Sequence, residues 1–320
     1  MSQATFSVQQ ILETPFPSYH TPLELARALN RSGDEAKRTK ALALLEGLSL
    51  RYPHVLAVGQ ELILALIESG EHERSELALR ALEITFGNLD DESLCRWGRL
   101  FKDRGDDYLE LPGAVSNRFA PNRDRALELY RKSLEKYGEA YGIRSGHYPG
   151  INKATLLLIV GSLKAQQTGH APRSVKELLE SEELARKLLA SRASWKRDHD
   201  DETIWHPATA GEAYLLRQDW AQAAALYREA LNGRHINHHA RESMRRQVER
   251  IVLAFGYLGV TIPPPFDDPA AFFAAAPRAV PGQTPGGAIS EPSLSSAGAG
   301  QMSDAERADP RGSGGSVPPA

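Results

Sequence analysis

Three residues with the chemistry to bind an anion lie within one short segment of the sequence. Arg99, Lys102 and Asp103 are three and four positions apart, so on a helix they share one face. The two cations could neutralise a phosphate, while the carboxylate could orient the arginine or accept a hydrogen bond from a ribose hydroxyl. An exposed, salt-bridged stripe has the same spacing and is the common alternative on helices.

A second candidate lies at residues 148–152, which read Tyr-Pro-Gly-Ile-Asn. Pro149 and Gly150 indicate a turn, and we expect a helix to begin at or just after Asn152. The first N–H groups of that helix would then be free to bind an anionic ligand. The alternative is an ordinary helix start in which Asn152 is only the N-cap.

Aromatic and basic residues elsewhere could complete such a site. Tyr148 and Trp205 are suited to stacking on a base. Near the end of the helical region, four arginines fall on one helix. They could form a phosphate-binding surface or a solvated face balanced by nearby glutamates. The arginines are Arg241, Arg245, Arg246 and Arg250, and the glutamates are Glu242 and Glu249.

The sequence offers no catalytic constellation. It contains no Ser-centred elbow, Walker loop or dinucleotide fingerprint. His235, His238 and His239 are closely spaced, but no carboxylate or cysteine completes a helical zinc motif. We therefore expect no catalytic residue, no metal and no cofactor, and a protein that is not an enzyme.

Composition argues against several classes of partner. The 320 residues are 41% hydrophobic and 25% charged, as in an ordinary soluble protein. A net charge of -3 gives no field for a nucleic-acid partner. The single cysteine, Cys95, excludes an intrachain disulfide and fits a reducing cytoplasm. The sequence shows no signal peptide and no apolar segment of membrane-spanning length, so we expect a cytoplasmic protein without a membrane partner.

Helices must position the candidate residues, because the apolar period is helical from about residue 21 to 260. Small and aromatic residues recur at the offsets of tetratricopeptide repeats. The sequence thus predicts an all-α fold, a right-handed tetratricopeptide-repeat-like α-solenoid of antiparallel helix pairs whose concave face binds ligands. The best repeat contains Gly211, Tyr214, Ala223, Tyr227 and Ala230. One weaker copy contains Gly98, Phe101, Ala126 and Tyr130, and another contains Ala41, Leu45, Leu48 and Pro53. The turn at 70–73 marks a further weak copy.

Three regions are expected along the chain. Residues 1–20 form an N-terminal extension, and residues 21–260 form the helical domain. Residues 261–320 are rich in Pro, Gly, Ala and Ser, a composition that predicts a disordered tail. Within the tail, residues 268–275 could form a short docked helix.

The order of these motifs resembles a known family. Residues 98–103, 123–132 and 148–152 together resemble the TRAF-binding central regulatory region of the apoptosis signal-regulating kinases. Bacterial relatives of that region form the tetratricopeptide-repeat sensor domain. The similarity runs from about residue 50 to 257. The chain contains no kinase motif, and its loop at 138–145 is longer than expected, so the signalling role in animals does not transfer directly.

The resemblance implies a sensor or scaffold module of a signalling, stress or defence system. In the bacterial relatives, such a module has been proposed to recognise a nucleotide-derived molecule and relay it to an effector protein. In the kinases, the corresponding region binds partner proteins. The alternative here is a pure protein-interaction scaffold that binds a peptide or effector through the groove. The ligand-binding residues we expect are Arg99, Lys102, Asp103, Tyr148, Asn152, Trp205 and Arg246.

Overall fold

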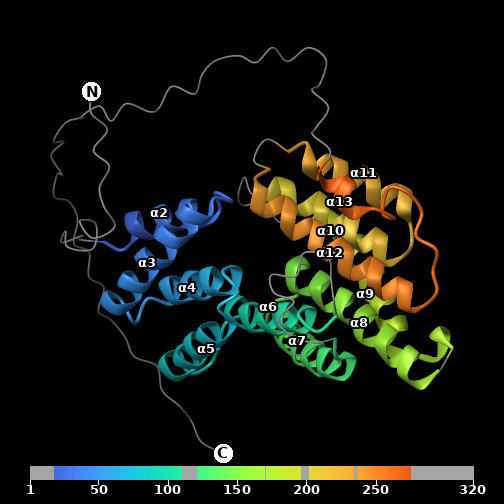
Figure 1. The fold of residues 1–320 in the computed structure, drawn as a ribbon, viewed down its shortest axis with the longest axis horizontal. Helices are drawn as coiled ribbons and strands as arrows, with labels where there is room; N and C mark the ends of the chain where they lie inside the picture. The colour runs from blue at the N-terminus through green and yellow to red at the C-terminus, as the bar shows by residue number, and fades with distance from the viewer. Residues whose placement is uncertain (1–17, 110–120, 170, 196–201, 234–235, 275–320) are drawn as a thin grey trace, which may run out of the picture. The chain divides into compact units, whose positions relative to one another are not determined.

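The computed structural model describes residues 18–274, except 110–120, 170, 196–201 and 234–235 (Figure 1). Within these residues the secondary structure is helical and contains no strand, which confirms the predicted all-α class. The α-helices are α2 (His20–Asn30), α3 (Glu35–Arg51), α4 (Leu56–Glu68), α5 (His72–Phe86), α6 (Asp91–Asp106), α7 (Arg123–Ile143), α8 (His147–Thr168), α9 (Lys176–Ala190), α10 (Glu202–Leu216), α11 (Trp220–Leu231), α12 (His238–Tyr257) and α13 (Pro269–Ala274). Two short 3₁₀ helices, Pro172–Ser174 and Arg192–Ser194, flank α9.

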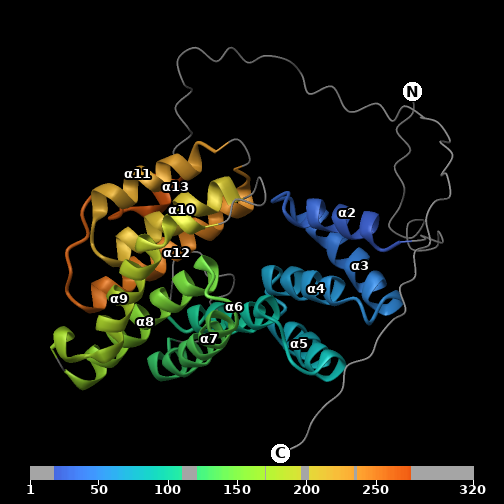
Figure 2. The same cartoon turned by 180° about the vertical axis from the view of Figure 1, so that it is seen from behind.

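Consecutive helices pack as pairs, which Figures 1 and 2 show from opposite sides. The pairs are α2 with α3, α4 with α5, α6 with α7, α8 with α9, and α10 with α11. Helix α12 follows the last pair and packs mainly against α8. The predicted array of helix pairs is therefore present.

Small residues stand where paired helices cross. A Cβ atom added to Gly98 of α6 would lie 2.6 Å from the ring of Tyr137 on α7. One added to Gly211 of α10 would lie 3.2 Å from the ring of Tyr227 on α11. Both tyrosines are fully buried, so glycine lets the ring of one helix approach the backbone of the other. The repeat pattern read from the sequence reflects this close packing.

Side-chain caps fix the starts of several helices. In each case, an Asp or Asn oxygen accepts a hydrogen bond from the backbone N–H three residues later, which satisfies a donor without an intrahelical partner. Such caps explain why the helices begin where they do. The capping residues are Asp34 for α3, Asp90 for α6, Asn122 for α7, Asp219 for α11 and Asn237 for α12.

The single cysteine belongs to the core. Cys95 is 3% exposed and lies in the largest apolar cluster, which extends from α6 to α13. Burial raises the pKa of its thiol, so the group stays protonated near neutral pH. Cys95 is therefore a packing residue rather than a reactive thiol.

The first part of the predicted tail packs against the helices. Phe266 and Phe273 are buried, and their rings lie 6.1 Å and 5.5 Å from the ring of Tyr227. The short helix expected at 268–275 is present as α13. Residues 275–320, where disorder is predicted, lie outside the described part of the chain, as do residues 1–17 of the predicted N-terminal extension.

Candidate functional site

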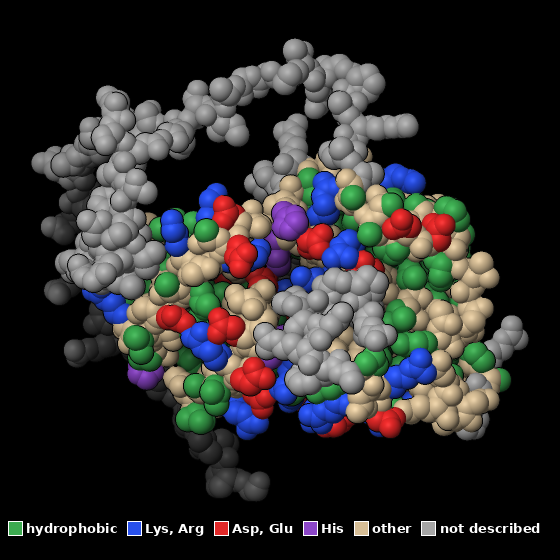
Figure 3. Space-filling model, viewed as in Figure 1, with side chains coloured by type: hydrophobic (Ala, Val, Ile, Leu, Met, Phe, Trp, Pro, Cys, Tyr) green, Lys and Arg blue, Asp and Glu red, His purple; other side chains and the backbone are tan. Residues whose placement is uncertain are grey.

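A polar cavity of about 160 Å³ lies among α2, α4, α6, α8, α10 and α12. Histidine, basic and acidic side chains gather around a hollow on the face seen in Figure 3. All seven residues expected from the sequence line the cavity: Arg99, Lys102, Asp103, Tyr148, Asn152, Trp205 and Arg246. The structure thus brings them together, and their binding of a ligand stays a prediction.

The predicted start of the helix at Asn152 is wrong. Helix α8 begins five residues earlier, at His147, with Gly146 as N-cap. Pro149 lies in the first turn, where its missing N–H costs nothing because that donor has no intrahelical partner. The N–H of Gly150 donates to the carbonyl of Gly146 at 3.1 Å, so the expected free N–H groups at 150–152 do not form an anion site.

Asn152 instead acts through its side chain. It is 5% exposed, and its Oδ1 atom accepts a hydrogen bond from Lys102 Nζ at 2.6 Å. Its Nδ2 group donates to the carbonyl of Tyr148 at 3.0 Å. Asn152 therefore holds the lysine of α6 against α8.

Lys102 is a buried cation of the cavity wall. Its ammonium also donates to Gln247 Oε1 at 3.2 Å, and the residue is only 6% exposed. Burial and the nearby charge of Arg250 lower the pKa of Lys102 to about 7, although Asp103 and Glu212 oppose this shift. Near neutral pH the group therefore exists in both protonation states, and an anion beside it would favour the charged one.

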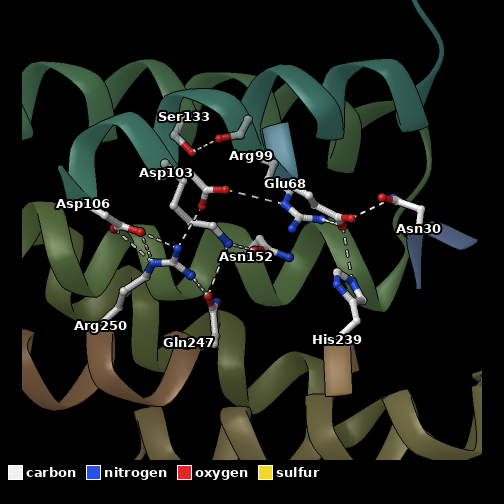
Figure 4. A network of polar contacts seen from close by, with 12 residues as sticks. Asn30, Glu68, Arg99, Asp103, Asp106, Ser133, Asn152, His239, Gln247 and Arg250 are labelled. Carbon is white, nitrogen blue, oxygen red and sulfur yellow. Dashed lines mark hydrogen bonds and ion pairs between the residues drawn. The ribbon is translucent and has the colours of Figure 1, made fainter. Parts of the chain in front are cut away.

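The charge of Arg250 is paired with carboxylates of the protein itself. Its Nε atom lies 2.9 Å from Asp106 Oδ2, and its Nη2 atom lies 2.9 Å from Asp103 Oδ1 (Figure 4). Asp106 also accepts a hydrogen bond from the hydroxyl of Tyr130 at 2.7 Å. Arg250 is 5% exposed. It is therefore neither the phosphate-binding residue nor the solvated residue that its sequence pattern suggested.

The other three arginines of α12 differ from one another. Arg245 pairs with Glu242 at 2.7 Å and also with Glu249, but its side chain is only 16% exposed and Glu249 is buried, so this pairing is not the expected solvated face. Arg241 donates to the carbonyl of Phe273 at 2.6 Å and so holds α13. Arg246 lines the cavity, and its buried Nε atom has no hydrogen-bond partner among the described residues. Of the four arginines, Arg246 therefore combines a place on the cavity wall with a guanidinium nitrogen that has no partner in the described part of the chain.

Arg99 faces the cavity rather than solvent. Its side chain is 18% exposed, and its Nη1 atom lies 3.2 Å from Glu68 Oε1. Its Nε atom lies 3.7 Å from Asp103 Oδ2. Although burial disfavours the charge, these two carboxylates raise the pKa of Arg99. The alternative of an exposed salt-bridged stripe is therefore wrong.

A second carboxylate network escaped the sequence analysis. Glu212 is 7% exposed and accepts hydrogen bonds from Gln247 Nε2 at 2.7 Å and from Thr155 Oγ1. Burial raises the pKa of Glu212. Gln247 joins this carboxylate to Lys102 and Arg250, with Nη1 of Arg250 donating to its Oε1 at 3.0 Å. The three-residue spacing of Gln247 and Arg250 was the available signal, because it places both on one helix face.

The arrangement combines hydrogen-bond donors and acceptors. Arg99, Lys102 and Arg246 offer donors to an anionic group, whereas Asp103 and Glu212 can accept from hydroxyl or amide groups. Within the described residues, no group of three or more His, Cys, Asp or Glu side chains could hold a metal ion, and His235 lies outside them. In the same part of the chain, no helix has the length and apolarity to cross a bilayer.

Comparison with known proteins identifies part of the chain. Residues 39–157 match the family model Tetratricopeptide Repeats-Sensor, whereas the comparisons with curated proteins and with solved structures gave no match. The matched segment includes the cavity residues of α6 and α8 but ends before Trp205 and Arg246. It supports a sensor or repeat-scaffold role, and the resemblance to the kinase regulatory region stays a prediction. Over residues 39–157 the chain is therefore similar to the tetratricopeptide-repeat sensor family.

Proposed function

We propose that the chain is a non-catalytic sensor module of a signalling, stress or defence system. Its cavity binds a small anionic, nucleotide-derived ligand, and the bound state is relayed to an effector protein. The proposal rests on where the residues predicted to bind a ligand lie in the structure. Seven residues selected from the sequence for their chemistry come from α6, α8, α10 and α12 and line one cavity.

The polar groups of the cavity suit a phosphate with hydroxyls beside it. Among the described residues the buried Nε atom of Arg246 has no hydrogen-bond partner, and such a donor is costly unless a ligand satisfies it. Arg99 and Lys102 add positive charge from α6 on another side. Asp103 then accepts from a ribose hydroxyl. These groups favour a nucleotide over a bare apolar ligand.

The size of the cavity suggests which part of the ligand it encloses. Small-molecule pockets usually measure about 300–1,000 Å³, so a cavity of about 160 Å³ encloses only part of a nucleotide. We place the phosphate end inside. Tyr148 is 41% exposed and lines the same cavity, so its ring is accessible for stacking on the base.

A pure protein-interaction scaffold is the alternative function. Tetratricopeptide arrays commonly bind peptides, and Arg99, Lys102 and Asn152 could clamp a carboxylate or a backbone group. The cavity is small for an extended peptide, which disfavours peptide binding at this position. An effector that binds elsewhere on the array is compatible with both functions.

Calorimetric titration with a panel of adenine nucleotides and ADP-ribose tests the proposal. Arg246 forms no ion pair with the residues that the structure describes, so for Arg246→Gln we expect about tenfold weaker binding at unchanged stability. Arg186→Gln, on the exposed side of α9, is the matched control and should bind like the wild type. If no nucleotide binds while an effector protein is still captured in a pull-down, the scaffold alternative holds.

A further inference from the structure

Glu68, the last residue of α4, joins three other helices beside the cavity (Figure 4). Its Oε2 atom accepts a hydrogen bond from Asn30 Nδ2 of α2 at 2.8 Å. Its Oε1 atom lies 3.2 Å from Arg99 Nη1 of α6 and 3.4 Å from His239 Nε2 of α12. The side chain is 8% exposed, so this carboxylate is buried at the junction of α2, α4, α6 and α12.

The two oxygens of Glu68 are held differently. Oε2 has a well-formed hydrogen bond, whereas Oε1 is buried and accepts none among the described residues. Charge alone therefore holds Oε1 near Arg99, without an aligned donor. An anion that meets the guanidinium in better geometry can replace it at Arg99.

His239 contributes less than Arg99 to holding the carboxylate. Burial lowers the pKa of His239, and the cations Arg99, Arg31 and Arg246 act in the same direction, while Glu68 opposes them. The imidazole is therefore mostly neutral at pH 7, and Arg99 is the principal counterion of Glu68. Arg99 of α6 therefore holds the Glu68 carboxylate in place, and in this place its Oε1 atom also lies beside His239 of α12.

A second close contact lies next to this junction. Gly33, in the loop between α2 and α3, has φ +77°, and an added Cβ atom would lie 2.8 Å from the Cβ atom of His238. The loop after α2 therefore touches the first residue of α12, which precedes His239 in the chain. The N-terminal helices and α12 meet at these two points, and both are at the cavity wall.

We propose that Glu68 is an internal counterion that occupies the anion position at Arg99 in the ligand-free chain. An anionic ligand displaces it from Arg99, and the displaced carboxylate no longer holds α2 and α4 to α12. Release of these helices is then the conformational signal available to an effector. The ligand-driven step rests on the proposed function, whereas the resting contact exists without a ligand.

The test compares Glu68→Gln with the wild type by hydrogen exchange and by titration with ADP. The glutamine keeps the shape and an oxygen for Asn30 but removes the charge that competes at Arg99. Without ligand, we expect faster exchange in residues 20–34 and 238–245. We expect ADP to bind the variant about tenfold more tightly, and to accelerate exchange in these segments only in the wild type.

Glu61→Gln is the matched control. Glu61 lies on the same helix and pairs with Arg27 of α2 at 2.9 Å, but it does not line the cavity. This variant loses the same charge between the same two helices. It should bind ADP like the wild type and leave exchange in residues 238–245 unchanged.

The outcomes separate the two proposals. Unchanged exchange in residues 238–245 of ligand-free Glu68→Gln overturns the resting contact. Equal or weaker ADP binding by this variant overturns the displacement. If no nucleotide of the panel binds either protein, the proposed function fails, and faster exchange in the variant still supports Glu68 as the contact between α4 and α12.

Discussion

The Nζ atom of Lys102 lies 2.6 Å from the Oδ1 atom of Asn152, 50 positions later in the chain. Both were expected to contact a ligand, yet in the ligand-free chain they contact each other. The contact joins α6 to α8 at the cavity wall. Lys102 is therefore positioned before a ligand arrives, and the energetic consequence of its burial can be measured.

Lys102 should make stability depend on pH. Its pKa is about 7 in the folded chain, whereas an unfolded lysine has an ordinary value of about 10.4. Between these values the unfolded chain binds more protons, so stability rises with pH, by up to about 1.4 kcal/mol per unit from this group. Relative to Lys102→Met, the free energy of unfolding of the wild type should therefore rise between pH 7.5 and 9.

Urea denaturation at several pH values in this window measures the difference between the two proteins. The other titrating groups are common to the wild type and Lys102→Met, so their contributions cancel in the difference between the two free energies of unfolding. A difference that stays constant with pH would show that Lys102 is charged in the folded chain.

Arg250 should be a major stabilising residue. Arg250→Met would leave Asp103 and Asp106 buried without their main counterion, and breaking a buried pair in this way costs about 3–5 kcal/mol. Chemical denaturation checks the loss. The control is Arg186→Met, whose partner Glu183 is on the exposed side of α9, and its denaturation midpoint should stay unchanged. Equal effects of the two variants would contradict the buried network.

Packing against Tyr137 should make Gly98 intolerant of a larger residue. Gly98→Ala places a Cβ atom 2.6 Å from this buried ring and should cost about 1–3 kcal/mol. Gly138→Ala is the control, because Gly138 lies in α7 with open space around its Cβ position. Its better helix propensity should stabilise the protein by up to about 1 kcal/mol. Thermal melts of the two variants should therefore shift in opposite directions.

The sequence predicted the fold well because its determinants are local. Gly98 and Gly211 mark close helix crossings, and only residues 217–219 separate the paired helices α10 and α11. These features depend on residues that are near in the chain, or on a repeat that shows them more than once. The start of α8 was missed because a proline is compatible both with a turn and with the first turn of a helix.

The candidate site could be predicted only in part. Helical spacing selected Arg99, Lys102 and Asp103 correctly as one face, and all three line the cavity. Their partners were not visible, because Glu68 and Gln247 are distant in the sequence and owe their roles to burial. For the same reason, spacing could not show that Arg250 pairs with two aspartates, whereas Arg246 forms no ion pair within the described part of the chain.

Substitutions of Arg99 show whether ligand binding depends on the shape of the cation as well as on its charge. Arg99→Lys keeps a positive charge near Glu68 and Asp103, so we expect little loss of stability. A lysine is a compact point charge and lacks the planar fork that binds phosphate oxygens in pairs. If Arg99 contacts the phosphate, this variant should bind the tightest nucleotide of the panel about tenfold more weakly.

Arg99→Ala should lose binding and also stability, because two buried carboxylates lose a counterion. Calorimetry combined with urea denaturation separates the two effects, and nucleotide binding by Arg99→Lys equal to that of the wild type would place the phosphate away from Arg99.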